Sequence, residues 1–354
     1  MNLLKKSPNL LFVLKYNKIM KNNFKKAFSL IEISIVILIV GILIAGISQG
    51  VDMVYDMRLA TARSLTDKAP MYGIDNLELW LETTSKESLA TGTASFVNVE
   101  NPADKQAIGR WNDLNPTTLN STQPYIDQLI SSYKLNPNYK NPASQPTSTM
   151  QPLYMKDGIN GLPALFFDGI NDYISPISNV SIINNFTVFI VAFPIDSITV
   201  NAESNTSATG TGGQKYIIYP LNGDLAVNRS VFNYCESCIS GAGISLGKNG
   251  IASYEHSSNY MPPYISKSLP IIKPIQLTLK YKNKLPNLYI NSINSYTSTW
   301  ASSKDVFPSL SFGGGYWGYF KGFIGEIIVY STDLSDTDRK LIENYLIEKW
   351  RIKP

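Results

Sequence analysis

The strongest pattern in the chain is an apolar run close to its N-terminus. A basic, strongly polar stretch ends at Ala27, and almost every residue from there to Ile47 is apolar. A helix of about 20 residues spans about 30 Å, which matches the hydrocarbon core of a bilayer. The pattern therefore predicts one transmembrane helix that begins at Phe28. A single acid, Glu32, lies inside it, and a carboxylate within a membrane span is a candidate functional residue.

Beyond this run the apolar side chains recur at steps of three and four residues, which is typical of an amphipathic helix. They are Val51, Val54, Tyr55, Leu59, Ala62 and Leu65. Pro70 and Gly73 then mark an end. We therefore expect one continuous helix over 28–68, with a transmembrane half and an amphipathic half, followed by a linker over 69–74.

The remaining residues, 75–354, have a different pattern. Short apolar runs of strand length alternate with segments rich in Ser, Asn, Thr, Gly and Pro, which is typical of an all-β sandwich. The runs are Leu165–Phe167, Phe186–Phe193, Tyr216–Tyr219, Ile275–Tyr281, Leu288–Ile290 and Gly325–Tyr330. The chain closes with a short predicted helix over 333–350, capped near Ser335, whose apolar face would carry Leu341, Tyr345 and Leu346.

The N-terminal features occur in a characteristic order. A Lys-rich leader ends in a small residue, Ala27, and is followed by Phe28, by Glu32 at the fifth position, and by a helix that outlasts the apolar run. Over roughly residues 21–68 this closely resembles type IV prepilins and type II secretion pseudopilins. The family usually has Gly where this chain has Ala27. An ordinary signal anchor with a chance Glu is the alternative interpretation.

The resemblance implies processing, partners and a location. A prepilin peptidase would cut between Ala27 and Phe28 and N-methylate Phe28. Glu32 would pair with the Phe28 amine of a neighbouring pilin or pseudopilin subunit, which would offset the cost of a buried carboxylate. The chain would cross the inner membrane once, with a cytoplasmic N-terminus and a periplasmic head. Assembly would then place it in a pilus or pseudopilus at the cell surface.

The charge balance changes when the leader is removed. The leader, residues 1–27, carries seven Lys and no acid, and the shorter leader that starts at Met20 is our preferred reading, with Met1 still open. The whole chain has 31 basic and 27 acidic residues, so the processed chain has 24 against 27 and a net charge of −3. The basic character of the whole sequence is therefore no sign of nucleic-acid binding.

Several segments of the head resemble, in order, the laminin-G-like or concanavalin-like jelly roll. The best match is Gly161–Tyr173, which contains Pro-Ala-Leu-Phe-Phe-Asp-Gly-Ile-Asn-Asp-Tyr. The others are Leu77–Glu82, Arg110–Leu114, Leu246–His256, Pro286–Asn291 and Phe320–Tyr330. The resemblance implies a jelly-roll sandwich over about 75–352. It does not assign a ligand, because such folds serve glycan binding, adhesion, catalysis and structure alike.

Two groups of head residues are candidate ligand sites. Asp168, Asn171 and Asp172 could hold Ca²⁺ with their side-chain oxygens, or they could build a turn through bonds to the backbone, which is our preferred reading. Tyr316 and Trp317 follow three glycines and could stack on sugar faces, although such residues more often pack the entry of a strand. No other cofactor or metal is expected.

The two cysteines, Cys235 and Cys238, favour a small disulfide in an exported domain, with two free thiols as the next reading. The chain has a single histidine, His256, so a four-ligand zinc site cannot be completed, and we expect His256 to be structural.

Three classes of function remain open for the head. The first is a minor pilin or pseudopilin whose head binds a glycan or a host or surface protein, and the second is a purely structural subunit. The third is a membrane-anchored glycan-active enzyme, but the chain lacks the Glu-x-Asp-x-x-Glu run of sandwich glucanases, and Glu326 stands alone. The sequence therefore predicts that the protein is not an enzyme.

Overall fold

The computed structural model describes residues 29–116, 141–176, 182–223 and 238–353. The chain divides into two compact units, residues 1–52 and residues 53–354. A single helix, α1 (Leu30–Thr66), passes from the first unit into the second. The second unit, which we call the head, contains every strand among the described residues.

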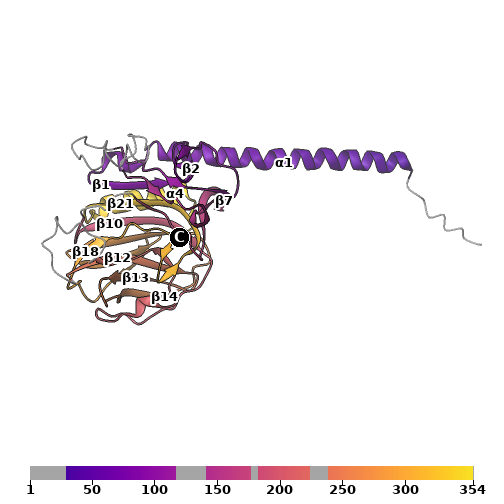
Figure 1. Ribbon diagram of the computed structural model, residues 1–354. Coiled ribbons are helices and arrows are strands. Elements are labelled where there is room, and N and C mark those ends of the chain that lie inside the picture. The colour runs from indigo at the N-terminus through magenta and orange to yellow at the C-terminus, as the bar shows by residue number, and fades with distance from the viewer. Residues whose placement is uncertain (1–28, 117–140, 177–181, 224–237, 354) are drawn as a thin grey trace, which may run out of the picture. The chain divides into compact units, whose positions relative to one another are not determined.

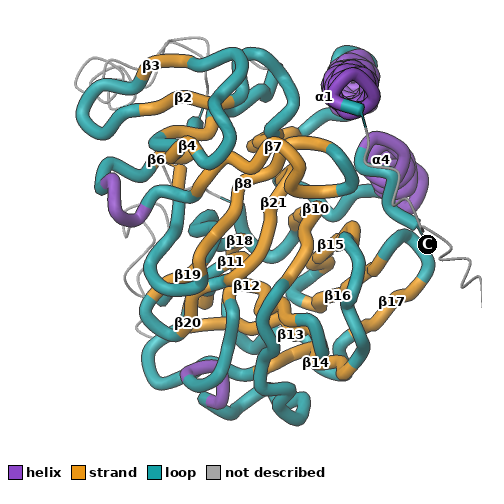
Figure 2. The backbone as a smooth tube through the Cα atoms, turned by 90° about the vertical axis from the view of Figure 1, so that its right-hand side faces the viewer, coloured by secondary structure: helices purple, strands orange, loops and turns teal. Residues whose placement is uncertain are grey.

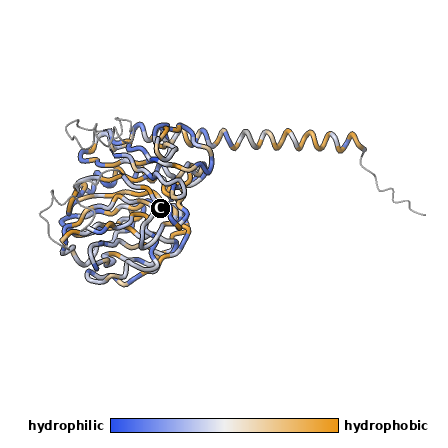
Figure 3. Tube along the Cα trace, viewed as in Figure 1, coloured by the Kyte–Doolittle hydropathy of each residue, from blue (hydrophilic) through white to orange (hydrophobic). Residues whose placement is uncertain are grey.

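In the first unit, α1 is apolar and its described side chains are exposed through Asp52. Figure 3 shows the hydrophobic colour along this part of the helix. Among the residues that the structure describes, α1 is the one helix long and apolar enough to cross a membrane. An exposed apolar surface of this extent is unfavourable in water, so this half of the helix needs a bilayer or other helices around it.

The larger sheet of the head has nine strands, and its paired strands are antiparallel throughout. Figure 2 shows its strands side by side from β7 to β17. In order across the sheet they are β17 (Asn294–Thr297), β16 (Leu285–Ile290), β15 (Ile275–Lys282), β10 (Phe186–Pro194), β21 (Lys321–Tyr330), β8 (Leu162–Asp168), β7 (Leu153–Ile159) and β4 (Gln106–Ala107), with β1 (Leu77–Glu82) also paired to β21.

The second sheet has seven strands and includes two parallel pairs. Its order is β14 (Pro263–Ser268), β13 (Gly250–His256), β12 (Ile239–Gly247), β11 (Tyr216–Ile218), β20 (Gly318–Tyr319) and β19 (Gly314–Gly315), with β18 (Asp305–Pro308) paired to β12. A small third sheet joins β3 (Val97–Asn98), β2 (Leu89–Thr91), β5 (Arg110–Trp111), β6 (Ala143–Ser144) and β9 (Ser175–Pro176). The short 3₁₀ turns are η1 (Pro70–Gly73), η2 (Ser148–Met150) and η3 (Thr209–Thr211).

The main hydrophobic core lies between the two large sheets. Ile190 of β10 and Ile327 of β21 belong to the same buried cluster as Ile244 of β12 and Ile251 of β13. Figure 1 shows these strands in stacked layers. The predicted all-β sandwich with a short C-terminal helix is confirmed. Short apolar runs predicted several of these strands, and β10 is apolar almost throughout because both faces of its sheet are covered.

A second core covers the opposite face of the nine-stranded sheet. The C-terminal helix α4 (Asp336–Lys349) and the last turns of α1 pack there against β1 and β21. Ser335 caps α4 as predicted, since its hydroxyl accepts the Asp338 N–H at 3.1 Å. The predicted apolar face was wrong in one position, because Leu341 is 50% exposed and Ile342 is buried in its place.

A buried ionic network ties α4 to the sheet. The Lys349 ammonium lies 2.9 Å from a carboxylate oxygen of Glu82 on β1 and 2.9 Å from one of Glu326 on β21, and none of these side chains is exposed. The indole N–H groups of Trp80 and Trp350 also donate to Glu326, at 2.8 and 2.7 Å. Because each buried charge has several partners, the network fixes how α4 sits on the sheet.

Candidate functional site

Of the three residues that carry the prepilin-like motif, only Glu32 is among the described residues, because Ala27 and Phe28 lie outside them. Glu32 occupies the first turn of α1, where its carboxylate accepts the Ser29 N–H at 2.7 Å. The Ser29 hydroxyl accepts the Ile31 N–H at 3.3 Å. Ser29 and Glu32 therefore form a reciprocal N-terminal cap, a role for Glu32 that we did not predict although the Ser-x-x-Glu spacing signals it.

The residues considered as Ca²⁺ ligands build a turn at the end of β8. One carboxylate oxygen of Asp168 accepts the N–H groups of Ile170 at 2.7 Å and Asn171 at 3.2 Å. The Asp172 carboxylate accepts the Asp168 N–H at 2.9 Å, and burial raises the pKa of Asp172 to about 7. Within the described part of the chain, no group of three or more His, Cys, Asp or Glu side chains is arranged to hold a metal.

The predicted aromatic pair forms the tip of a tight hairpin. Tyr316 and Trp317 are the two residues between β19 and β20, whose paired ends are Gly315 and Gly318. The Tyr316 ring is 82% exposed and stands edge-on to Trp317, with ring centroids 4.6 Å apart. Gly318 has a φ of +153°, and a Cβ there would lie 2.1 Å from the Gln214 carbonyl oxygen, so only glycine fits. We call this segment, residues 314–319, the aromatic hairpin.

Other aromatic residues, which the sequence did not identify, support this hairpin from behind. Trp317 and Tyr219 pack against a buried cluster formed by Tyr216, Ala252, Tyr254 and Met261. A Cβ on Gly315 would lie 2.6 Å from the Tyr219 ring, so that ring contacts the hairpin backbone directly. His256 is edge-on to Tyr219, with centroids 6.5 Å apart, and its Nδ1 lies 2.8 Å from the Pro220 carbonyl oxygen.

The turn and the hairpin, predicted separately, lie at the same edge of the sandwich. In the pairing of β8 with β21, Asp168 lies opposite Lys321, which is two residues beyond the end of the hairpin. Next to the hairpin, a Cβ on Gly313 would lie 3.0 Å from the Asp172 carbonyl oxygen. Ile170, at the turn, is 72% exposed. The structure therefore places an exposed aliphatic side chain, Ile170, and an exposed aromatic side chain, Tyr316, on adjoining turns.

The cysteine prediction falls partly outside the described residues. Cys238 is disulfide-bonded in the structure, and Cys235 is not among the described residues. The Cys238 carbonyl accepts the Asp305 N–H at 2.8 Å, which places it where β12 and β18 begin to pair.

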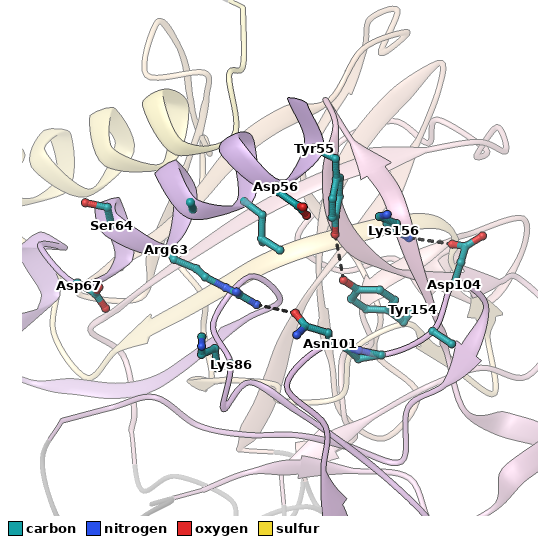
Figure 4. A pocket seen from close by; sticks show the side chains of 14 residues that line it. Tyr55, Asp56, Arg63, Ser64, Asp67, Lys86, Asn101, Asp104, Tyr154 and Lys156 are labelled. Carbon is teal, nitrogen blue, oxygen red and sulfur yellow. Dashed lines mark hydrogen bonds between the residues drawn. The ribbon is translucent and has the colours of Figure 1, made fainter. Parts of the chain in front are cut away.

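A groove of about 740 Å³ runs along the last turns of α1 within the head, as Figure 4 shows. The hydroxyl groups of Tyr55 and Tyr154 are 3.4 Å apart across it, and the Lys156 ammonium lies 4.3 Å from the Tyr55 ring centre. Arg63 crosses to the opposite wall and donates to the Asn101 side chain at 3.1 Å. Acidic and basic groups alternate around the groove, and its main contacts hold the helix to the head.

Comparison with known proteins identifies the N-terminal motif from its sequence, whereas the head is similar to known proteins in its fold alone. Residues 22–48 match the model of the prokaryotic N-terminal methylation motif. No curated protein matches the chain.

Among solved structures, domain 4 of an extracellular GH43 arabinanase from Geobacillus stearothermophilus, in complex with arabinotriose, is 18% identical, with a TM-score of 0.36 over 54% of this chain and 80% of that one. An arabinofuranosidase in complex with arabinofuranosyl-xylobiose is 11% identical, with a TM-score of 0.43 over 79% of this chain and 64% of that one. A Trypanosoma rangeli sialidase is 12% identical, with a TM-score of 0.37 over 76% of this chain and 32% of that one.

These neighbours correct one expectation. The absence of a glucanase-type carboxylate run predicted that the protein is not an enzyme, but the three similar structures named above come from an arabinanase, an arabinofuranosidase and a sialidase. The sequence argument considered only one arrangement of catalytic carboxylates. Hydrolases can use other arrangements, so the absence of this one does not exclude an enzyme. The exclusion is therefore withdrawn. The chain carries the N-terminal motif of a type IV pilin-like precursor, followed by a β-sandwich head.

Proposed function

We propose that this protein is a minor pilin or pseudopilin-like subunit, inserted in the inner membrane and assembled into a type IV pilus or a type II secretion pseudopilus. The observation that carries the proposal is the methylation motif over residues 22–48, which runs directly into the exposed apolar half of α1. Prepilin peptidase and other pilin subunits are the expected partners. Release of the chain with mechanically sheared filaments, in step with the other subunits, tests this part.

We further propose that the head binds a glycan or a surface protein through the aromatic hairpin. The exposed Tyr316 ring and the half-buried Trp317 offer flat apolar faces at the tip of a tight hairpin, whose paired ends are Gly315 and Gly318. A ring that is already fixed loses little conformational entropy when a ligand stacks on it. Tyr and Trp are also enriched among residues that dominate binding energy.

Replacing both Tyr316 and Trp317 with Ala is expected to weaken ligand binding by at least tenfold, because each stacked ring contributes about 1 kcal/mol beyond its buried area. A glycan array and a surface-protein array, probed with the head of the wild type and of the double variant, measure this. The matched control is Tyr72→Ala, which removes another exposed aromatic ring far along the chain. Ligand binding that survives in the double variant contradicts the assignment of the hairpin.

A further inference from the structure

Glu255 is a carboxyl group that the proposed function does not use. It lies on β13 and is 0% exposed. Successive side chains of a strand point to opposite faces, so Tyr254 and His256 face the aromatic cluster while Glu255 faces the core between the sheets. There its carboxyl meets Tyr281 of β15, in the opposite sheet, at 3.2 Å. Glu255 is therefore a titratable group in the middle of a hydrophobic sandwich.

The partners of this carboxyl are all hydroxyl groups. Ser240 on β12 and Ser302 donate to one oxygen at 3.0 and 2.5 Å, and Tyr281 donates to the other. The other buried head glutamates have cations within salt-bridge distance: Glu82 and Glu326 share Lys349, and Glu343 has Arg339 at 2.6 Å. Among the described residues, Glu255 receives no hydrogen bond from a cation.

The groups that face Glu255 come from three directions. Tyr281 reaches it from β15, and Tyr260 and Tyr264, whose hydroxyls are 2.5 Å apart, flank it from the β13–β14 side. Lys304 acts on it at longer range and places its ammonium 4.7 Å from the Tyr260 ring centre. His256 points to the other face of β13 and interacts with Pro220. Burial outweighs the hydrogen bonds from Ser302, Ser240 and Tyr281 and raises the pKa of Glu255 to about 7.

Through Ser302 this carboxyl also holds a connecting segment. Residues 298–304 join β17 to β18 and are attached to the neighbouring hairpin by two backbone bonds, Ser298 N–H to Pro286 O at 3.0 Å and Ser302 N–H to Lys284 O at 2.9 Å. The Ser302 hydroxyl links this segment to the core, because it donates to Glu255 and also accepts the Lys304 N–H at 3.1 Å.

We propose that Glu255 is a proton-operated latch, which keeps residues 298–304 closed over the edge of the sandwich while it is protonated and lets them open when the proton leaves to solvent. A neutral carboxyl needs no cation in the core, whereas a carboxylate there has only hydroxyl partners. Opening of the segment admits water to the charge. The segment continues into β18, which pairs with β12 close to Cys238, so the motion reaches the strand that begins at the disulfide.

Hydrogen exchange followed by mass spectrometry on the full processed chain in detergent tests the latch. In the wild type, protection of amides in residues 298–304, corrected for the intrinsic pH dependence of exchange, should fall by about tenfold per pH unit above about pH 7. In Glu255→Gln, which keeps the shape and removes the titration, the corrected protection should not change between pH 5.5 and 8.5. The control Glu348→Gln, at an exposed position on α4, should behave as wild type.

A wild-type segment whose corrected protection is the same at pH 5.5 and 8.5 would overturn the proposal, as would an equal pH slope in Glu255→Gln. If that variant does not fold, infrared spectroscopy of the Asp172→Asn variant decides, because burial raises the pKa of Asp172 to about 7 as well and its band would overlap that of Glu255. The proposal requires a protonated carboxyl band that disappears between about pH 6 and pH 8, and a carboxyl that is ionised throughout contradicts it.

Discussion

Glu32→Ala is expected to reduce the amount of this chain in sheared filaments by at least tenfold, while the amount in the membrane stays the same or rises. Removal of the carboxylate lowers the cost of inserting α1 by about 2.5–3.5 kcal/mol. It also removes the group that would neutralise the Phe28 amine of a neighbouring subunit. Insertion and assembly should therefore respond in opposite directions. Immunoblots of the sheared and membrane fractions, with another pilin subunit as reference, measure both.

The cap that Glu32 forms with Ser29 requires a second variant. Glu32→Gln keeps an oxygen that can accept the Ser29 N–H but carries no charge, and Gln is accepted at this position of a capping box. If pairing of charges drives assembly, Glu32→Gln fails as Glu32→Ala does. Normal incorporation of Glu32→Gln would show that Glu32 acts by capping alone, and normal incorporation of both variants would leave it without a role in assembly.

Lys349→Met is expected to destabilise the head by about 3–5 kcal/mol, the cost of leaving buried carboxylates without their cation. Two carboxylates, Glu82 and Glu326, depend on this one ammonium, and all three side chains are fully buried. Denaturant unfolding of the processed chain in detergent, followed by tryptophan fluorescence, measures the loss, because Trp80 and Trp350 both contact Glu326. Lys340→Met, at an exposed position of the same helix, is the matched control and should change stability little. A loss below about 1 kcal/mol for Lys349→Met would contradict the account of this network.

The same network makes the stability of the head depend on pH in the acid range. Burial alone would raise the pKa of Glu82, but the Lys349 ammonium and hydrogen bonds from Ser85, Ser88 and Thr84 outweigh it and lower the pKa to about 2. Because the folded pKa lies below the unfolded value near 4.5, the contribution of Glu82 is complete above about pH 4.5 and is lost as the pH falls towards 2. Lys349→Met should weaken this acid dependence along with the stability.

The sequence predicted the parts of the fold that depend on local pattern. Strands β10 and β15 appear where the apolar runs placed them, and the Ser335 cap appears where the capping signal placed it. The apolar face of α4 was predicted with Leu341 in place of Ile342. The helix packs Ile342 against residues of both α1 and β1, and these tertiary contacts, which the local sequence does not show, decide which of the two side chains is buried. The ionic network joins β1, β21 and α4, which are far apart in the chain, and nothing local signals their meeting.

The candidate site, like the fold, could be predicted from the sequence only in part. Tyr316 and Trp317 were found because three glycines precede them, and they do form an exposed hairpin tip. Tyr219 and His256 were missed as their neighbours, since each belongs to a different strand region and only the pairing of the second sheet brings them together. His256 was expected to be structural, which stays a prediction; its Nδ1 lies 2.8 Å from the Pro220 carbonyl oxygen.

The measurement that tests the central claim most directly is the N-terminal sequence and intact mass of the mature protein, extracted from membranes of cells with active prepilin peptidase. The account predicts a chain that starts at Phe28 and is heavier by one methyl group on its α-amine. A chain that retains Lys25, Lys26 and Ala27 in those cells would contradict it. Cells without the peptidase provide the reference, since there the leader should remain attached.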